Sequence, residues 1–459
     1  MKETDLIIIG AGPGGYRAAE LAAKAGLKVV IFEADEVGGT CLNVGCIPTK
    51  AFARNAELIQ QLKSATEFGL CDLSYQLDFQ QVIARKNQVV SQLRQGVEAI
   101  LAHPNITLVR QRVHFVDAHT IAVATSDSVI PLQSTYTAPH IIIATGSENK
   151  VLPDLKGYCT HEQLLEMKQL PKRLCIIGAG VIGMEFASIF SSFGVDVTVV
   201  EFMKECLPAL DSDIAKRLRK VLEKRGVVFH MQCAVKQIEE HDLGKIVGFE
   251  NKKGQIEQVE ADCVLMAVGR KPRVSDDFQN AGFEYDEHQG IKVTSILSFE
   301  TTVKGIYAIG DVNGLSMLAH AAEWQARQAV NAITMAPPPL IGIDGPHIPA
   351  AIFTNPEAAC VGLSEDACQA KGIDYECHKA FYRANGKAIA MGETEGMVKL
   401  LSEPGKGRII GCHVFGAHAA DLVQEVSALM CKDVPVWHLR DMIHIHPTLS
   451  EILLAAAEQ

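Results

Sequence analysis

Two cysteines, Cys41 and Cys46, lie five residues apart in a short segment that runs from Gly38 to Lys50. On an ideal α-helix, residues at this spacing have Cα atoms about 8.6 Å apart, whereas a disulfide requires roughly 4.4–6.8 Å. A bond between the two thiols therefore needs a distorted turn, which Gly45 and Pro48 would permit. Because a bent disulfide is easily reduced, the segment favours a working redox pair. The alternative is two buried thiols on a helix.

A glycine-rich cluster occurs twice, at a constant offset of 168 residues. Residues 10–15 read Gly-Ala-Gly-Pro-Gly-Gly and residues 178–183 read Gly-Ala-Gly-Val-Ile-Gly, each after a short apolar run. An acid, Glu33 or Glu201, follows each first glycine 23 residues later. In a strand–loop–helix unit, such glycines allow a tight turn, close approach of a pyrophosphate and packing of the helix on the strand. The repeat predicts two dinucleotide sites, and two tight strand-to-helix turns are the alternative.

The two acids add a prediction about the nucleotide. An acid at the end of the second strand of such a unit accepts hydrogen bonds from a ribose hydroxyl. The negative charge of Glu201 would also repel a 2′-phosphate, so the second site is predicted to bind NAD rather than NADP. Two dinucleotides and a cysteine pair on one chain indicate a redox relay.

Strands and helices must alternate around these residues, which predicts an α/β fold. Apolar residues recur at helical spacing over Leu58–Leu62 and Phe79–Ala102, and strand-like runs fill Thr107–Ile142. Gly305–Asp311 predicts a further strand that ends in Gly-Asp. Prolines gathered in Met335–Pro349 indicate a boundary, beyond which strand and helix patterns mix without a glycine fingerprint.

Composition excludes several classes of protein. The chain has 459 residues, enough for about three domains. Its net charge of −11 and lack of a basic block make nucleic acid and anionic membranes poor partners. No apolar stretch reaches the length of a bilayer span, and the N-terminus runs straight into a strand-like segment, so we expect a cytoplasmic protein.

Thirteen cysteines are too few for a secreted disulfide framework in a chain of this length. No cysteine or histidine spacing supports a metal site, so no metal is expected. The eleven cysteines outside the pair, such as Cys175, Cys263 and Cys412, are expected to sit singly in apolar strands, most of them as small core residues.

Taken in order, the motifs resemble those of the class I flavoprotein disulfide reductases, over essentially the whole chain. The matching segments are GAGPGG from Gly10, GGTCLNVGCIPTK from Gly38, ATG from Ala144, GAGVIG from Gly178, AVGR from Ala267, AIGD ending at Asp311, MLAH from Met317 and HPTLSE from His446. The cysteine motif and HPTLSE together are very specific.

The resemblance implies two Rossmann-like dinucleotide-binding domains and a C-terminal α+β dimerisation domain. An FAD-binding domain would occupy residues 1–146 and return over 271–338. An NAD-binding domain would occupy 147–270, and the dimerisation domain 339–459.

The resemblance also implies the ligands of FAD, which would bind without a covalent bond. Glu33 would hold the adenosine ribose and Asp311 the ribityl chain. Lys50 would pair with Glu185 near the reactive flavin nitrogen; a solvated lysine at a helix end is the alternative. The remaining FAD residues would be Gly10, Gly12, Gly14, Gly15, Val113, Thr145, Gly146, Ser147, Met317, Leu318, Ala319 and His320. NAD would contact Gly178, Gly180, Gly183, Glu185, Glu201, Val235 and Gly269.

Two residues of HPTLSE carry a further prediction. From spacing alone, Thr448 and Glu451 fit a capping box before a helix over Ile452–Ala457, and His446 could be an ordinary loop histidine. An imidazole and a thiol nevertheless exchange protons well near neutral pH. By the resemblance, His446 is the acid/base and Glu451 the carboxylate that orients it. His444 is expected to support packing rather than bind a metal.

The resemblance implies that a dithiol, dihydrolipoamide or the lipoylated domain of a 2-oxoacid dehydrogenase or glycine cleavage complex, loses a proton to His446 and attacks Cys41. Cys46 would be left as a thiolate against the flavin, and the electrons would pass through FAD to NAD⁺. A homodimer is implied, because members of the family place this histidine opposite the other subunit's disulfide.

Related reductases fit less well. Mercuric reductases carry a C-terminal cysteine pair, whereas the last cysteine here is Cys431. Glutathione-type reductases prefer NADPH, and soluble transhydrogenases lack the cysteine pair.

The chain departs from the family pattern at Leu315-Ser316, where Gly-Pro is frequent, and at Ala321, where lysine is common. An NADH oxidase or diaphorase with incidental cysteines and a chiefly structural subunit of a multienzyme complex remain as alternatives.

Overall fold

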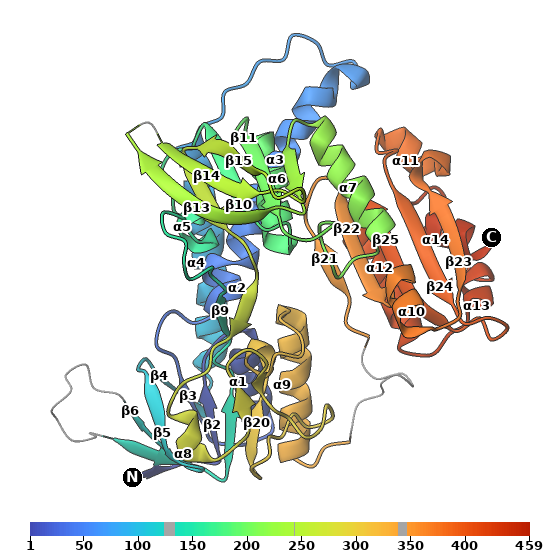
Figure 1. Ribbon diagram of the computed structural model, residues 1–459. Coiled ribbons are helices and arrows are strands. Elements are labelled where there is room, and N and C mark those ends of the chain that lie inside the picture. Colours follow the sequence, from blue (N-terminus) through green and yellow to red (C-terminus); the bar gives the residue numbers. More distant parts are fainter. Residues whose placement is uncertain (124–133, 243, 338–346) are drawn as a thin grey trace. The chain divides into compact units, whose positions relative to one another are not determined.

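The computed structural model describes residues 1–123, 134–242, 244–337 and 347–459 of the chain, which has the expected mixed α/β fold (Figure 1). It divides into two compact units, each discontinuous in sequence. The first unit contains Met1–Ala51, Gln81–Lys150 and Gly269–Pro339, and the second contains Phe52–Gln80, Val151–Val268 and Leu340–Gln459. The four-domain division of the sequence stays a prediction, and its boundary at 338/339 lies outside the described residues.

A parallel sheet forms the centre of the first unit, in the order β20-β8-β2-β3-β4. Its strands are β2 (Leu6–Ile9), β3 (Val29–Phe32), β4 (Ile106–Val109), β8 (His140–Ile143) and β20 (Ile306–Ala308). Helices α1 (Pro13–Lys24) and α9 (Ala319–Ile333) pack against each other beside it (Figure 1). Strand β3, which follows β2 in the chain, is the neighbour of β2 on one side. The neighbour of β2 on the other side, β8, comes much later in the sequence. The loop after β2 therefore lies at the switch point where open α/β sheets bind nucleotides.

The first unit also contains a four-stranded sheet of β1 (Lys2–Glu3), β7 (Thr135–Thr137), β6 (Thr120–Val123) and β5 (Val113–Asp117). Two small pairs join β9 (Ser147–Asn149) to β17 (Arg270–Pro272), and β18 (Tyr285–Asp286) to β19 (Gly290–Ile291). Its shorter helices include α8 (Phe278–Ala281) and η2 (Gly310–Asn313).

The second unit repeats the strand order of the first around its own glycine loop. Its parallel sheet has the order β12-β11-β10-β16, with β10 (Arg173–Ile177), β11 (Asp196–Glu201), β12 (Val228–Met231) and β16 (Cys263–Met266). Helix α6 (Val181–Ser192) follows β10, which again has neighbours on both sides. An antiparallel sheet of β13 (Ala234–His241), β14 (Gly244–Glu250) and β15 (Ile256–Ala261) adjoins it. The repeat read from the sequence thus corresponds to two equivalent strand–loop–helix units.

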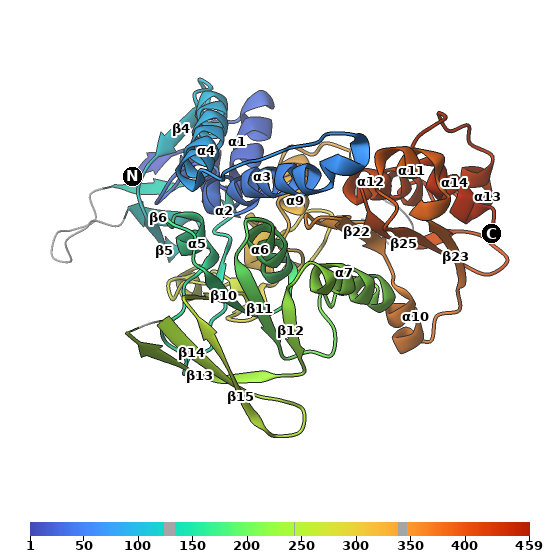
Figure 2. The ribbon, with the colours of Figure 1, turned by 90° about the horizontal axis from the view of Figure 1, so that it is seen from above.

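The last part of the second unit is an antiparallel sheet in the order β21-β22-β25-β24-β23. These strands are β21 (Ala350–Ile352), β22 (Glu357–Gly362), β23 (Glu376–Phe381), β24 (Met397–Ser402) and β25 (Ile409–Gly416). Helices α12 (Ala419–Met430) and α14 (Glu451–Ala457) cover one face, and α7 (Ser212–Lys224) covers the other (Figures 1 and 2). The remaining helices of the unit are α5 (His161–Leu165), α10 (Glu365–Lys371), α11 (Gly386–Met391), α13 (Val436–Arg440), η1 (Ala65–Phe68) and η3 (Tyr382–Ala384).

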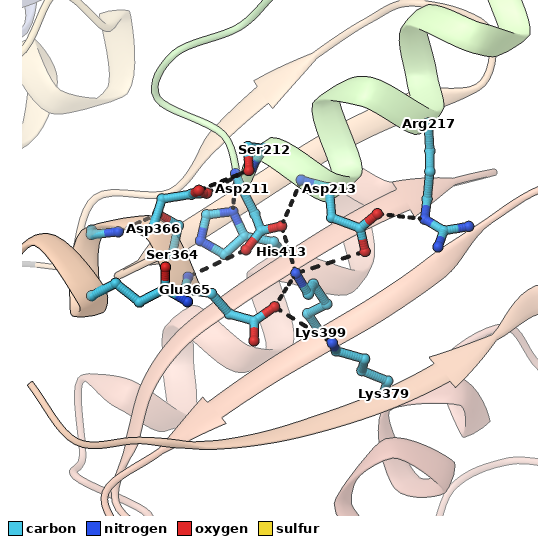
Figure 3. A network of polar contacts seen from close by, with 12 residues as sticks. Asp211, Ser212, Asp213, Arg217, Ser364, Glu365, Asp366, Lys379, Lys399 and His413 are labelled. Carbon is cyan, nitrogen blue, oxygen red and sulfur yellow. Dashed lines mark hydrogen bonds and ion pairs between the residues drawn. The ribbon is translucent and has the colours of Figure 1, made fainter. Parts of the chain in front are cut away.

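A buried charge network joins α7 to this sheet (Figure 3). Asp211 caps α7 and accepts a hydrogen bond from the amide of Asp213 at 3.1 Å. The same carboxylate pairs with the Lys399 ammonium at 2.6 Å, and both side chains are 2% exposed. Lys399 also contacts Glu365. The amide of Asp211 donates to Nδ1 of His413 at 3.1 Å, so the cap, the cation and the imidazole share one buried cluster.

Both helices predicted after the cysteine segment are present. The one predicted over Leu58–Leu62 is part of a longer helix, α3 (Cys46–Ser64), and the one predicted over Phe79–Ala102 is α4 (Phe79–Leu101). The strands expected over Thr107–Ile142 include β5 to β8, and residues 124–133 of that range lie outside the described residues. In the described part of the chain, no helix combines the length and apolar content needed to cross a membrane.

Candidate active site

The cysteine pair lies where the helix breaks. Cys41 belongs to α2 (Gly39–Val44), and Cys46 is the first residue of α3. Between the helices, Gly45 has φ −132° and ψ −107°, and a Cβ atom there would lie 2.9 Å from the carbonyl oxygen of Thr40. The distorted turn that the five-residue spacing required is therefore confirmed, and it depends on glycine.

Both cysteines are reduced here, and their side chains form a hydrogen bond. That bond, together with burial, raises the pKa of Cys41, while the nearby charge of Lys50 opposes the shift. Cys46 is exposed and Cys41 half-buried. The pair is thus within reach of an incoming thiol, with the sulfurs adjacent as a reversible disulfide requires.

Polar side chains hold the turn around the thiols. Asn43 donates to the carbonyls of Val37 and Gly39, both at 3.0 Å, and accepts from Nε of Arg94 at 2.9 Å. Thr49 donates its hydroxyl to the carbonyl of Gly45 at 2.7 Å. These bonds fix both sides of the break, so the spacing of the thiols is set by the backbone.

The first glycine loop has the geometry of a phosphate cradle. Gly10 has φ +100°, and a Cβ there would meet the carbonyl oxygen of Ala144 at 2.3 Å. At Gly12 the nearest atom to an added Cβ is 3.9 Å away, so the loop is open on that side. Glu33 accepts from the amide of Ala11 at 2.7 Å. The acid expected to hold a ribose therefore also fixes the loop, a role the sequence did not reveal.

Asp311 and Ser147 meet in the first unit. The Ser147 hydroxyl donates to the Asp311 carboxylate and accepts from Nε of Arg270 at 2.8 Å. Burial raises the pKa of Asp311, and the bond from Ser147 opposes the shift. Arg270 also donates to the side chain of Asn149 at 2.7 Å. In the sequence, Arg270 stood out only as part of a motif. In the structure, its hydrogen bonds hold the end of the strand that is expected to lie beside the flavin.

The other residues expected around FAD all lie in the first unit. Thr145 and Gly146 follow β8, and the Thr145 hydroxyl donates to the carbonyl of Arg273 at 3.2 Å. Val113 begins β5, and Met317–His320 lead into α9. Gly14 and Gly15 belong to α1, where a Cβ at Gly15 would lie 1.8 Å from the carbonyl oxygen of Gly10.

The second glycine loop repeats the first in detail. Gly178 has φ +103° and faces the carbonyl oxygen of Ala267, 2.5 Å from an added Cβ. A Cβ at Gly180 would meet no atom within 4 Å. Glu201 accepts from the amide of Ala179 and, at 2.6 Å, from that of Met203. The buried carboxylate thus holds its loop as Glu33 holds the first.

The remaining residues expected around NAD are more dispersed. Gly183 lies in the first turn of α6 beside Gly178, and Val235 lies on β13. Glu185, also on α6, is 4% exposed and accepts from the amide of Phe353 at 2.9 Å. Gly269 falls in the first unit. The pairing of Lys50 with Glu185 stays a prediction.

His446 and Glu451 are in direct contact. Nδ1 of His446 lies 2.9 Å from Oε1 of Glu451, and the amide of Thr448 donates to Oε2 at 2.7 Å. The hydrogen bonds from the Thr448 amide and from His446 lower the pKa of Glu451, and the bond from Thr448 has the larger effect. The helix begins at Glu451 with Ser450 as its cap. Of the alternative capping box with Thr448 as cap, only the bond from the Thr448 amide to Glu451 forms. The Thr448 hydroxyl instead donates to the carbonyl of Ile445.

His444 takes part in packing. Its Nε2 lies 3.0 Å from the Glu425 carboxylate on α12, and its side chain is 7% exposed. Within the described ranges, no group of three or more cysteine, histidine or acidic side chains is arranged to hold a metal ion.

Two open glycine loops on parallel sheets and a thiol pair at a helix break define a pyridine-nucleotide and dithiol oxidoreductase. The chain belongs to the pyridine nucleotide-disulphide oxidoreductase family, whose model matches residues 4–326, and the dimerisation domain of that family matches residues 348–457.

Relatives support this assignment over the full length. The chain is 36% identical to the dihydrolipoyl dehydrogenase of Bacillus subtilis, covering 99% of this chain and 96% of that protein. It is 37% identical to the dihydrolipoyl dehydrogenase of Rhizobium etli, covering 98% and 97%. Among solved structures, the HOCl-induced flavoprotein disulfide reductase RclA from Escherichia coli, as a Cu(II) complex, is similar with a TM-score of 0.86 and 29% identity, covering 100% of this chain and 99% of that chain.

The residues present fit the two cofactors of this family, FAD and NAD. Each loop leaves space at its second glycine, where a pyrophosphate must approach the backbone. Each helix that follows directs its N-terminus toward that space. The residues that would hold FAD are those of the first unit, and the Gly178 loop with Glu201 would hold NAD.

Proposed function

We propose that this protein is an FAD-dependent dihydrolipoamide dehydrogenase that oxidises a dihydrolipoyl dithiol and reduces NAD⁺ to NADH. The observation that carries the proposal is the adjacent Cys41 and Cys46 thiols at the break between α2 and α3. Full-length relatives named dihydrolipoyl dehydrogenase support the substrate. The Glu201 carboxylate at the second loop supports NAD over NADP.

The proposed roles follow from the chemistry of each group. In the oxidised enzyme Cys41 and Cys46 are joined by a disulfide. His446 accepts a proton from a substrate thiol, and the resulting thiolate attacks Cys41, which breaks the Cys41–Cys46 bond and expels Cys46 as a thiolate. The second substrate thiol then attacks the substrate sulfur bound to Cys41, which releases the substrate as a disulfide and leaves both cysteines reduced. The chemistry that FAD supplies when bound is two-electron transfer between a dithiol and NAD⁺.

We propose a homodimer, in which His446 serves the dithiol of the partner subunit. The match to the dimerisation domain supports this arrangement. The proposed partners are free dihydrolipoamide or lipoylated domains of a 2-oxoacid dehydrogenase or glycine cleavage complex, and the proposed location is the cytoplasm.

Initial rates with two substrate pairs test the proposal. Purified protein loaded with FAD should reduce NAD⁺ with dihydrolipoamide at a rate far above that of NADPH oxidation with glutathione disulfide. No activity with dihydrolipoamide would overturn the substrate assignment.

The likeness to a differently named flavoprotein disulfide reductase supports a second candidate, in which the same thiols reduce another disulfide. NADH-dependent reduction of a panel of disulfides separates the two. Preference for any of them over lipoamide would favour the second candidate.

A further inference from the structure

A second pair of cysteines lies together in the second unit, outside the proposed active site. The sulfurs of Cys159 and Cys263 are 3.3 Å apart although the residues are 104 positions apart in sequence. The expectation that Cys263 sits singly in a strand is therefore wrong. Local periodicity could not reveal the contact, because it depends on how two distant segments meet.

The backbone holds the two sulfurs on one face of the parallel sheet. Cys159 forms a parallel bridge with Leu265 of β16, and its amide donates to the carbonyl of Val264 at 2.8 Å. Bridged residues, and residues two apart on a strand, point to the same face. Cys159, Leu265 and Cys263 therefore share a face. Cys175, which is paired with Val264, points to the other face and does not compete.

The gap between the sulfurs is small. A disulfide bond is about 2.05 Å long, so the sulfurs must approach by roughly 1.3 Å. Both residues are half-buried rather than enclosed, which leaves them open to a small reagent. They begin as thiols in hydrogen-bond contact. Because Cys159 pairs with Leu265, two residues along the strand from Cys263, closing the disulfide requires a small shift of the segment around Cys159 as well as rotation of both side chains.

The surroundings favour loss of one proton from the pair. When one sulfur is ionised, the remaining S–H donates to it; this bond lowers the pKa of Cys263, burial opposes the shift, and Lys245 assists it. Lys245 is held nearby by the carbonyl of Gly157 and by Glu240 at 2.8 Å. The Asp262 carboxylate acts in the opposite sense. A thiolate is the reactive form of cysteine.

We propose that Cys159 and Cys263 are a second redox-active dithiol, which a small hydroperoxide oxidises to a reversible disulfide. The Cys263 thiolate attacks the peroxide, forms a sulfenic acid and releases hydroxide, which takes up the proton that Cys263 gave up. The Cys159 thiol then attacks that sulfur and water leaves. In sum, two thiols and one hydrogen peroxide give one disulfide and two waters.

This oxidation leaves the dinucleotide loop untouched. Cys263 is the first residue of β16, whereas the Gly178 loop follows the carboxyl end of the neighbouring strand β10. The disulfide would fasten the segment around Cys159 to the sheet at the opposite end. Activity with dihydrolipoamide should therefore survive its formation.

Peptide mapping tests the proposal. Fully reduced, FAD-loaded protein is treated with one equivalent of hydrogen peroxide under argon, alkylated and digested with trypsin. Cys159 falls alone in peptide 157–168 and Cys263 alone in peptide 254–270, while Cys41 and Cys46 share peptide 29–50. A linked pair of peptides 157–168 and 254–270 is expected, and dithiothreitol should release it.

Variants complete the test. Cys159→Ser should abolish the linked pair and leave Cys263 as a sulfenic acid that dimedone traps, whereas Cys71→Ser, which removes an exposed cysteine, should leave the linkage unchanged. Linkage in the wild type with unchanged NADH production supports the proposal. Full alkylation of both cysteines after peroxide, or linkage of either one to another cysteine, would overturn it.

Discussion

The contact between His446 and Glu451 fixes which nitrogen of the imidazole can act as a base. A carboxylate accepts hydrogen bonds and cannot donate them, so Nδ1 of His446 carries the proton that reaches Glu451. In the neutral ring, Nε2 is then the proton acceptor. The Thr448 amide holds the second oxygen of Glu451, which sets the orientation of the carboxylate.

Replacing His446 by glutamine should lower kcat for dihydrolipoamide oxidation by about 10²–10⁴-fold, the usual contribution of a general base. Glu451→Gln should cost less, because the amide oxygen can still accept from Thr448 while the charge that stabilises the imidazolium is lost. Initial rates measured from pH 5.5 to 8.5 provide the comparison.

The matched control for this pair is His444→Gln, which removes a histidine two residues away that contacts Glu425 and has no role in the proposed chemistry. It should retain kcat within about twofold. If His446→Gln did the same, the assignment of His446 as the base would be wrong.

At the scale of elements, the first and second glycines of each glycine loop have different roles. An added Cβ clashes with backbone at Gly10 and Gly178, whereas Gly12 and Gly180 have open space on the corresponding side. The first position of each loop is therefore required by the fold, and the second is required by the ligand.

Gly180→Ala should raise the KM for NAD⁺ by at least about tenfold, which corresponds to loss of roughly 1.4 kcal/mol of binding. The apparent Tm should stay within a degree or two, because the new methyl group meets no protein atom within 4 Å. Steady-state kinetics and differential scanning calorimetry on the same preparation provide the two readings. An unchanged KM would place the nucleotide elsewhere.

The sequence predicted those parts of the site that depend on neighbouring residues. The glycine loops, the acids at the ends of β3 and β11 and the break at Gly45 all follow from local geometry. The helix start near Glu451 was misjudged because Thr448 and Ser450 both suit a cap, and the Thr448 hydroxyl is taken by the carbonyl of Ile445 instead.

The buried charge network at α7 is expected to stabilise the packing of that helix on the C-terminal sheet. Burial alone would lower the pKa of Lys399, but its bonds to Asp211 and Glu365 prevail and raise it. Lys399→Met would leave Asp211 buried without its cation and should lower the free energy of unfolding by about 3–5 kcal/mol.

The control is Lys379→Met, which removes an exposed lysine 3.5 Å from Glu365. Such surface pairs contribute about 0–1 kcal/mol. Urea unfolding followed by circular dichroism measures both variants, and equal losses would contradict the special role of Lys399.

At the scale of the whole molecule, most of the features that the sequence did not predict are contacts between residues that lie far apart in the chain. Lys399 and Asp211 are 188 positions apart, and nothing in their local pattern marks either as buried. The carboxylates of Glu33 and Glu201 were expected to face a nucleotide, and only the folded loops show that they also bind the backbone.

The same network gives the protein a pH dependence. Burial lowers the pKa of His413, whereas in the unfolded chain histidine has an ordinary pKa of about 6.5. Below that pH the unfolded chain binds a proton that the folded protein does not, so stability should fall as pH falls, by up to about 1.4 kcal/mol per pH unit, until the folded-state pKa is reached.

His413→Asn isolates this contribution, because the amide oxygen can accept from Asp211 in place of Nδ1 without titrating. The variant should show a smaller drop in apparent Tm between pH 7.5 and 5.5 than the wild type. Equal drops would mean that other groups account for the acid sensitivity.

The central claim is that electrons pass between NADH and the Cys41–Cys46 pair, and labelling under anaerobic conditions tests it most directly. Oxidised, FAD-loaded protein is mixed with one equivalent of NADH and alkylated at once, and peptide 29–50 is analysed. We predict that both Cys41 and Cys46 become labelled as NADH is consumed, and that Cys46→Ser protein gains no such pair of labels. Consumption of NADH with no new label on this peptide would contradict the account and favour an oxidase with incidental cysteines.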